Sequence, residues 1–357
     1  MRNRIHTQSL CKQPRKIRWI AMLLHGFFAW AFFGGLALSA QTFNSYRLVV
    51  VDGEQERQDL FATAFNDENV VVGTSRLPGE ERRFFIWRPL EGIEYLGNAN
   101  AYGLFGDVNN WEYVVGTNSE PGLWIWKDTL LAQLDVGGNL PAFINDHLQL
   151  AGTRSVNGQR RGFIQRMVDS KGGYNLDDIG HLGGGSSEVH AINNQGTVVG
   201  CSHNADGEKR AFRFSQQTGM VLLEIPLDSG NYSIAKAVND DDDILVWNSF
   251  ESYLVDGETG LVDTIEAPEP AELIRAVSIN GRGDAVGSYV VQGSALVRPF
   301  IWREGIAVDL NELVSQLPKN VTLVSPVAIN ENGAILIQGL RDNTIQAFIL
   351  EPVMRRW

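Results

Sequence analysis

Four arginines hold the same place in a recurring pattern, so they are the first residues to consider for binding chemistry. Each begins a segment rich in aromatic residues: Arg83, Arg161, Arg210 and Arg298. A guanidinium fork recognises carboxylate, sulfate or phosphate groups through paired hydrogen bonds. Arginines brought to one face would form a ligand-binding surface for an anion. In the alternative, which we favour, each arginine pairs with an acidic neighbour and recurs because the unit was duplicated.

Acidic residues gather at turns that also recur. They follow asparagines in Asn66-Asp67-Glu68, Asn145-Asp146, Asn239 to Asp243 and Asn330-Glu331. Calcium takes about six to eight oxygen ligands, which makes the turn from Asp240 to Asp243 the candidate calcium site. However, Asp and Asn are ordinary turn residues, and no stretch has the alternating Asp spacing of a calcium loop. The sequence favours turn chemistry here and predicts no cofactor.

The fourth copy of the pattern contains metal-ligand residue types: His181, His190, Cys201 and His203. A regular hairpin register places His190 opposite Gly200. The same register places Cys201 opposite Val189. Side chains on adjacent rungs of a sheet point to opposite faces. We therefore expect His190 and Cys201 not to converge, and the sequence predicts no metal site.

Motifs for catalysis are missing from the sequence. It has no Gly-x-Ser-x-Gly elbow, no phosphate-binding loop and no His-Glu-x-x-His pair. We therefore assign no catalytic residue. A site built at the centre of a repeat fold would leave no local motif, so an enzyme is kept as the alternative.

All of these residues belong to one pattern that occurs seven times. Its marker is an asparagine that opens a tight turn: Asn66, Asn109, Asn145, Asn193, Asn239, Asn280 and Asn330. Each copy contains four short segments typical of strands. The first ends at the asparagine, the second is β-branched and often ends on Gly, the third carries an aromatic residue and the fourth is short. Four strands in units of about 40–50 residues are typical of propeller blades.

The two ends of the chain predict how the ring closes. The seventh copy stops after its third segment, at Phe348-Ile349-Leu350. The apolar segment from Leu48 to Val51 lies where a fourth strand stands before the next asparagine. The sequence thus predicts an all-β, seven-bladed β-propeller of four-stranded blades, closed by the N-terminal strand, over residues 41–357. A single helical turn is expected within Leu310 to Leu317.

Residues 1–40 have the pattern of a secretory signal peptide. Six basic residues and no acidic residue precede an uncharged, mostly apolar run from Trp19 to Leu38, and small residues follow at Ser39 and Ala40. We expect cleavage after Ala40, which leaves no segment for membrane insertion. An uncleaved anchor is the alternative, since about 20 apolar residues can span a bilayer. The predicted location is secreted, periplasmic or at the cell surface.

The chain without this leader is strongly acidic. It keeps 24 Lys and Arg against 42 Asp and Glu, a net charge of −18. This charge argues against nucleic acid as a partner, because such binding needs basic patches. Cys201 is the one cysteine left, so an internal disulfide is excluded and stability must come from packing.

The fourth copy carries the most specific motif: His181-Leu182-Gly183-Gly184, Ala191 to Gly196, Val198-Val199-Gly200 and Ala211-Phe212. This motif resembles the bacterial extracellular HAF repeat, a family named after His-Ala-Phe at the third strand. The resemblance covers nearly all of residues 46–350, although arginine replaces the family's histidine in four copies. It implies secretion and a β-propeller-like repeat fold. It implies no defined activity, so no catalytic residue is carried over.

These observations predict a secreted, non-enzymatic repeat protein that acts as a binding or scaffold module in the bacterial envelope or extracellular space. Its ligand is left open between a glycan, an anion and another envelope protein. The alternative is an extracellular propeller enzyme, a glycan lyase or hydrolase with its site in the central channel. Two carboxylates about 5–10 Å apart in the channel would favour a glycosidase, and an aliphatic plug would favour the scaffold.

Overall fold

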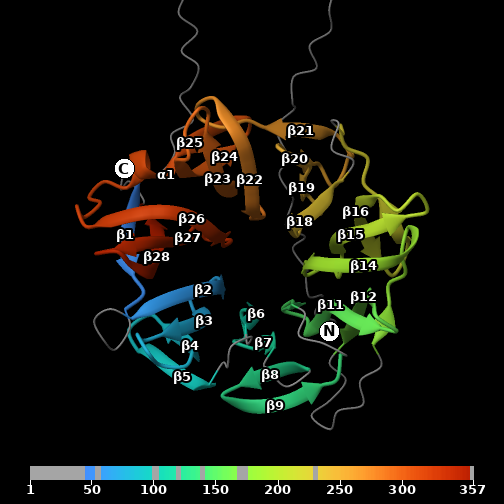
Figure 1. Cartoon of the computed structure of the whole chain (residues 1–357), viewed down its shortest axis with the longest axis horizontal. Coiled ribbons are helices and arrows are strands. Elements are labelled where there is room, and N and C mark those ends of the chain that lie inside the picture. Colours follow the sequence, from blue (N-terminus) through green and yellow to red (C-terminus); the bar gives the residue numbers. More distant parts are fainter. Residues whose placement is uncertain are drawn as a thin grey trace, which may run out of the picture. The chain divides into compact units, whose positions relative to one another are not determined.

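The described part of the chain forms seven four-stranded antiparallel sheets arranged as a ring (Figure 1). The computed structural model describes residues 45–52, 58–98, 104–117, 122–136, 141–166, 176–227 and 232–353. The predicted signal peptide over residues 1–40 lies outside these ranges. Among the described residues no helix is long and apolar enough to cross a membrane. The prediction of an all-β, seven-bladed propeller is confirmed.

In each blade the strands follow one another from the channel outward, in chain order except in the last. Blade one contains β2 (Asp59–Phe65), β3 (Val71–Arg76), β4 (Arg83–Arg88) and β5 (Gly92–Asn98). Blade two contains β6 (Leu104–Val108), β7 (Val114–Thr117), β8 (Leu123–Lys127) and β9 (Thr129–Leu134). Blade three contains β10 (Ala142–Ile144), β11 (Gln149–Val156), β12 (Gln159–Arg166) and β13 (Asp177–Asp178). Blade four contains β14 (Gly183–Ile192), β15 (Val198–Asn204), β16 (Lys209–Ser215) and β17 (Gly219–Leu222).

The remaining three blades repeat this plan. Blade five contains β18 (Ile234–Val238), β19 (Ile244–Trp247), β20 (Ser252–Val255) and β21 (Val262–Ile265). Blade six contains β22 (Ala271–Ile279), β23 (Ala285–Val291), β24 (Val297–Arg303) and β25 (Ile306–Asp309). Blade seven contains β26 (Val321–Ile329), β27 (Ile335–Arg341), β28 (Thr344–Pro352) and, as its outermost strand, β1 (Tyr46–Val50).

The N-terminal strand closes the ring, as predicted. β1 runs antiparallel to β28, with Leu48 opposite Leu350. Tyr46 in this strand and Val51 directly after it are buried at 2% and 0% exposure, so this segment contributes to the core as well as to the sheet. The predicted helical turn is also present, as α1 (Leu310–Leu313), whose first turn is capped by the side chain of Asp309.

The core lies between blades. Val71 of β3 packs in the cluster shared with blade seven, and the next residue, Val72, packs in the cluster shared with blade two. Alternate side chains of a strand point to opposite faces of its sheet. Because both faces of a blade are covered by its neighbours, the first residues of the second strand must be apolar on both faces. This explains the β-branched runs seen in the sequence.

The innermost strand pair is irregular in six blades, where the pairing shifts by one residue shortly before the turn asparagine. Such a β-bulge sets two residues of one strand against one of its partner. In blade four the strands approach so closely that a Cβ on Gly200 would lie 1.9 Å from the Glu188 oxygen. The recurrent Gly on the second strand thus admits the bulge, a role that the sequence analysis missed.

Candidate functional site

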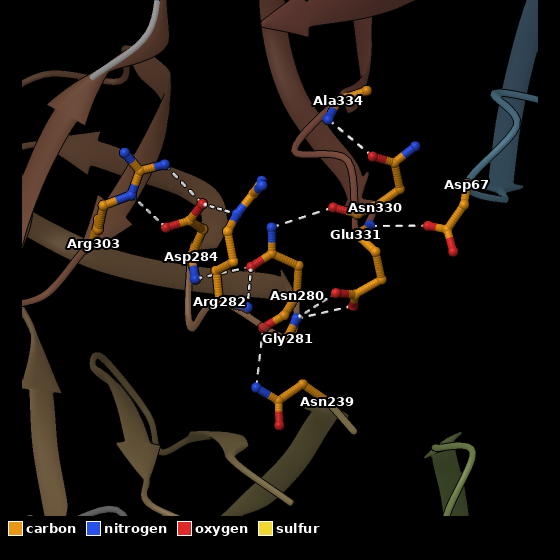
Figure 2. A network of polar contacts seen from close by, with 10 residues as sticks. All are labelled: Asp67, Asn239, Asn280, Gly281, Arg282, Asp284, Arg303, Asn330, Glu331 and Ala334. Atoms are coloured by element: carbon orange, nitrogen blue, oxygen red, sulfur yellow. Dashed lines mark hydrogen bonds and ion pairs between the residues drawn. The ribbon is translucent and has the colours of Figure 1, made fainter. Parts of the chain in front are cut away.

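The seven turn asparagines form a closed ring of hydrogen bonds at one end of the channel. Each Nδ2 donates to the main-chain oxygen of the next asparagine along the chain, over 2.8–3.2 Å. The last of these bonds runs from Asn330 back to Asn66. We call this end of the blades, where the first and second strands are joined, the asparagine end. Figure 2 shows the part of the ring that contains Asn239, Asn280 and Asn330.

Each of these asparagines also fixes its own turn. In Asn280, Oδ1 accepts hydrogen bonds from the main-chain nitrogens of Arg282 (3.0 Å) and Asp284 (3.1 Å), as Figure 2 shows. The side chain therefore needs an acceptor on one side and a donor on the other, a combination that Asp lacks. All seven are buried, at 0–6% exposure. Turn chemistry alone would tolerate Asp or Gly at this place, so the invariance of Asn was the sequence signal for the ring.

A second circle of residues is more exposed to solvent than the first. It is formed by the residues that follow the asparagines, of which one is Gly281 and six carry polar side chains: Asp67, Asn110, Asp146, Asn194, Asp240 and Glu331. Except at Gly281, each side chain accepts a hydrogen bond from the main-chain nitrogen of its counterpart in the preceding blade, over 2.8–3.0 Å. The amide of Asn110 also bridges Asp67 (2.8 Å) and Asp146 (3.0 Å).

Four of these side chains are carboxylates, and we call them the acidic mouth: Asp67, Asp146, Asp240 and Glu331. They line a cavity of about 190 Å³ at the centre of the ring. The apolar residues that precede the asparagines line the same cavity: Phe65, Val108, Ile144, Ile192, Val238, Ile279 and Ile329. The cavity is thus lined by carboxylates and by apolar side chains together.

The charge of the acidic mouth is not neutralised by ion pairs. Within the described ranges, none of its four carboxylates forms a salt bridge, and their hydrogen-bond donors are neutral amides. Burial raises the pKa of Glu331, and the negative charges of Asp67 and Asp240 raise it further, while the hydrogen bond from Gly281 and the charge of Arg282 oppose the rise. The mouth is therefore an electronegative site held in place by uncharged groups.

Asp107 is a further carboxylate on the cavity wall. Burial raises its pKa to about 7. Its two oxygens accept hydrogen bonds from the main-chain nitrogens of Val108 (2.9 Å) and Ile144 (3.1 Å), so it ties blade two to blade three. Ser278 makes the equivalent bond to Ile329 between blades six and seven. This shared geometry indicates a structural tie at Asp107.

The four repeated arginines lie at the opposite end of the blades, where the second and third strands are joined. We call this the arginine end. Each has an acidic partner within its own blade: Arg83 with Glu80 (2.5 Å), Arg161 with Asp178 (2.9 Å), Arg210 with Glu208 (2.5 Å) and Arg298 with Asp309 (3.0 Å). These contacts agree with the pairing alternative. A role of the four arginines in binding an anionic ligand stays a prediction.

The acidic turn of blade five uses its carboxylates for hydrogen bonds. Asp240 accepts from the nitrogen of Asn194 (2.8 Å), and Asp242 accepts from the side chain of Asn193 (2.8 Å). Asp243 accepts from the nitrogen of Gly257 (3.0 Å). These side chains serve the turn and the contact with blade four, which agrees with turn chemistry, and calcium binding here stays an untested alternative.

The expectation that His190 and Cys201 point apart is wrong. The bulge at His190 places Glu188 opposite Cys201 and Val189 opposite Gly200. Because the register is shifted by one residue, Cys201 changes to the face occupied by Glu188 and His190. Ligand atoms of Glu188, His190 and Cys201 lie within 4.8 Å of one another. A register that is extended from the turn assumes regular pairing, so it does not reveal a bulge further along the two strands.

No family model matches the sequence, and neither does any curated protein. Solved propellers resemble the structure. One chain from the crystal structure of a mitotic checkpoint complex aligns over 94% of this chain and 99% of its own length, with a TM-score of 0.54 and 14% identity. A second is the extracellular domain of a protein from B. thetaiotaomicron described as a hybrid two component system. It aligns over 85% of this chain and 40% of its own length, with a TM-score of 0.54 and 11% identity. These similarities show the propeller fold.

Proposed function

We propose that this protein is a non-enzymatic binding module that holds a positively charged partner at the acidic mouth. The observation that carries the proposal is the ring of four carboxylates around one cavity, with no ion pair to them among the described residues. A strongly acidic protein attracts cationic partners over long range. The partner class is a lysine- or arginine-bearing segment of another protein.

The size of the cavity favours a side chain over a sugar chain. Its volume of about 190 Å³ is smaller than the roughly 300–1,000 Å³ of pockets that enclose drug-sized ligands. One long cationic side chain can enter, with its charge among the carboxylates and its methylene groups near the apolar wall. Since main-chain and amide donors already orient the carboxylates, little order has to be created on binding.

A binding role is better supported than the enzyme alternative. A glycosidase needs one carboxyl group as acid and another as base or nucleophile. Asp107, with its raised pKa, is the candidate acid in the channel. Both of its oxygens are engaged by the main chain, to Val108 and Ile144, which leaves it poorly placed to transfer a proton to a substrate.

Export from the cytoplasm is part of the proposal. It is supported by the basic and then apolar leader over residues 1–40 and by the HAF-repeat resemblance. The acidic charge of the remaining chain suits a partner in the envelope or extracellular space. At the arginine end an anionic partner would have to displace Glu80, Asp178, Glu208 and Asp309 from their arginines.

Binding of a lysine-rich peptide, measured by calorimetry at low and high salt, tests the proposal. The double variant Asp67→Asn/Asp240→Asn should weaken binding by about 30-fold, since two charges at close range are worth about 1 kcal/mol each in water-like surroundings. The control Glu224→Gln/Glu258→Gln removes the same charge from exposed positions on the outer part of the blades. Equal losses in both variants, or no binding by the parent protein, would reject the acidic mouth as the binding surface.

A further inference from the structure

Blade four departs from the other blades at a group of residues that face one another. In four blades the residue directly after the Gly of the second strand carries a hydroxyl group: Thr74, Thr117, Thr153 and Ser288. Blade four has Cys201 there, and His190 is the histidine at a bulge position. The repeat serves as an internal comparison. Five other blades build the same bulge without these side chains, so the fold does not require them.

We propose that Glu188, His190 and Cys201 form a binding site for a zinc(II) ion. Their ligand atoms lie within 4.8 Å of one another. Zinc bonds are about 2.0–2.3 Å long, so ligand atoms around one tetrahedral ion lie about 3–4 Å apart. Small side-chain rotations would bring the three groups to that separation. Three protein ligands leave the fourth position of the ion for a water molecule.

His190 is prepared to act as a ligand. Its Nδ1 lies 3.0 Å from the main-chain oxygen of Ala235, and since that oxygen only accepts, Nδ1 carries the proton. The lone pair is then on Nε2. A second hydrogen bond of this kind is the usual support of a metal-binding histidine.

The charges around the group select the kind of metal. Glu188 contacts Arg160 (2.9 Å) and Lys209 (3.5 Å), and the positive charge of Lys236 acts on His190. Burial raises the pKa of Glu188, and the charges of Lys209 and Arg160 lower it by more, so the carboxylate is ionised. Three nearby cations oppose any metal ion. A hard ion such as calcium gains little from sulfur, whereas zinc forms a strong bond to thiolate that offsets the repulsion.

Binding must release a proton. The thiolate is the form of cysteine that binds metal, so the thiol of Cys201 must lose its proton. Zinc therefore replaces the proton on Sγ, which leaves to solvent, and one S–H bond is exchanged for one S–Zn bond. It follows that the apparent affinity falls as the pH is lowered.

The test uses the full chain with Cys11→Ser, so that Cys201 is its single thiol. Cobalt(II) is titrated first, because cobalt–thiolate bonding gives a charge-transfer absorption, and zinc affinity then follows by competition. Cys201→Ser should abolish the absorption. Loss of an outer-shell partner weakens metal binding by about 10–100-fold. His190→Gln removes a ligand itself, so it should weaken zinc binding by more than that. The control His203→Gln, in the same blade, should change nothing.

Lys236→Met gives a result that a purely structural cluster would not. Removal of a neighbouring positive charge should tighten zinc binding, and circular dichroism confirms folding of every variant. No thiolate absorption in the parent chain, or absorption that persists in Cys201→Ser, would overturn the proposal. If Cys201→Ser fails to fold, the opposite effects of His190→Gln and Lys236→Met decide, and unchanged affinity in both would reject the site.

Discussion

The two ends of the blades use recurring residues in different ways. At the asparagine end each repeated residue bonds to its counterpart in the next blade, so donor and acceptor recur together. At the arginine end each repeated arginine bonds within its own blade, and the acidic partner comes from one of two places. It lies in the loop before the third strand for Arg83 and Arg210, and at the end of the fourth strand for Arg161 and Arg298. A repeated residue with a repeated partner joins the units. A repeated residue with a variable partner is held locally.

The largest effect should come from removing the strand that closes the ring. Deletion of residues 41–52 takes away β1 and the buried side chains of Tyr46 and Val51. Each large buried apolar side chain contributes about 1.5–3 kcal/mol, and β28 would gain an unpaired edge. The loss is comparable with a total stability of about 5–15 kcal/mol, so the asparagine ring should lose its closure.

Thermal unfolding followed by circular dichroism measures this loss. A synthetic peptide of residues 44–52, added to the truncated chain, should restore part of the stability by pairing with β28. Identical melting of the truncated and intact chains would show that β1 does not hold the ring together.

A smaller effect separates the ring from ordinary turn chemistry. Asn280→Ala removes the bond to Asn330 and two bonds within the turn, at a fully buried place. Unsatisfied buried groups cost about 1–3 kcal/mol each, so we expect a loss of about 3–5 kcal/mol in the free energy of unfolding. Urea denaturation measures this loss.

Asn204 provides the matched control. It accepts from the nitrogens of Asp206 (3.0 Å) and Glu208 (2.9 Å) in the same turn geometry, but its side-chain nitrogen bonds within the turn, to Glu208. Asn204→Ala should therefore cost only about 1 kcal/mol, as for the loss of a typical cap. Similar losses for Asn280→Ala and Asn204→Ala would mean that the ring adds nothing beyond the turns.

The smallest expected effects are at the arginine end. Arg83→Gln breaks an exposed pair with Glu80 and should lower stability by about 0–1 kcal/mol. Arg303→Gln is the counterpart at the asparagine end, where Arg303 holds the buried carboxylate of Asp284 (Figure 2). Leaving that carboxylate without this partner should cost about 2–3 kcal/mol, below the full figure for a buried pair because Arg303 is partly exposed. A larger loss for Arg83→Gln in denaturation would reverse the comparison.

Much of the architecture could be predicted because each copy of the repeat confirms the others. The asparagine spacing indicated the number of blades, and the incomplete seventh copy together with Leu48 to Val51 indicated the closing strand. Chemistry between strands was harder to predict. The face on which Cys201 lies depends on a bulge at His190, and the turn sequence alone does not encode it. The acidic mouth joins residues from several blades, so it was visible only as separate turns.

The asparagine ring has a mechanical consequence. In an open stack of repeats the terminal unit has one neighbour and can fray while the rest stays folded. Here the bond from Asn330 to Asn66 leaves every blade with two neighbours, so there is no terminal unit to peel away. A force that pulls one blade outward is shared by all the other hydrogen bonds of the asparagine ring. Cleavage by a protease would then require the whole ring to open. The rate of that opening, and not the stability of the weakest blade, would set the lifetime of the protein.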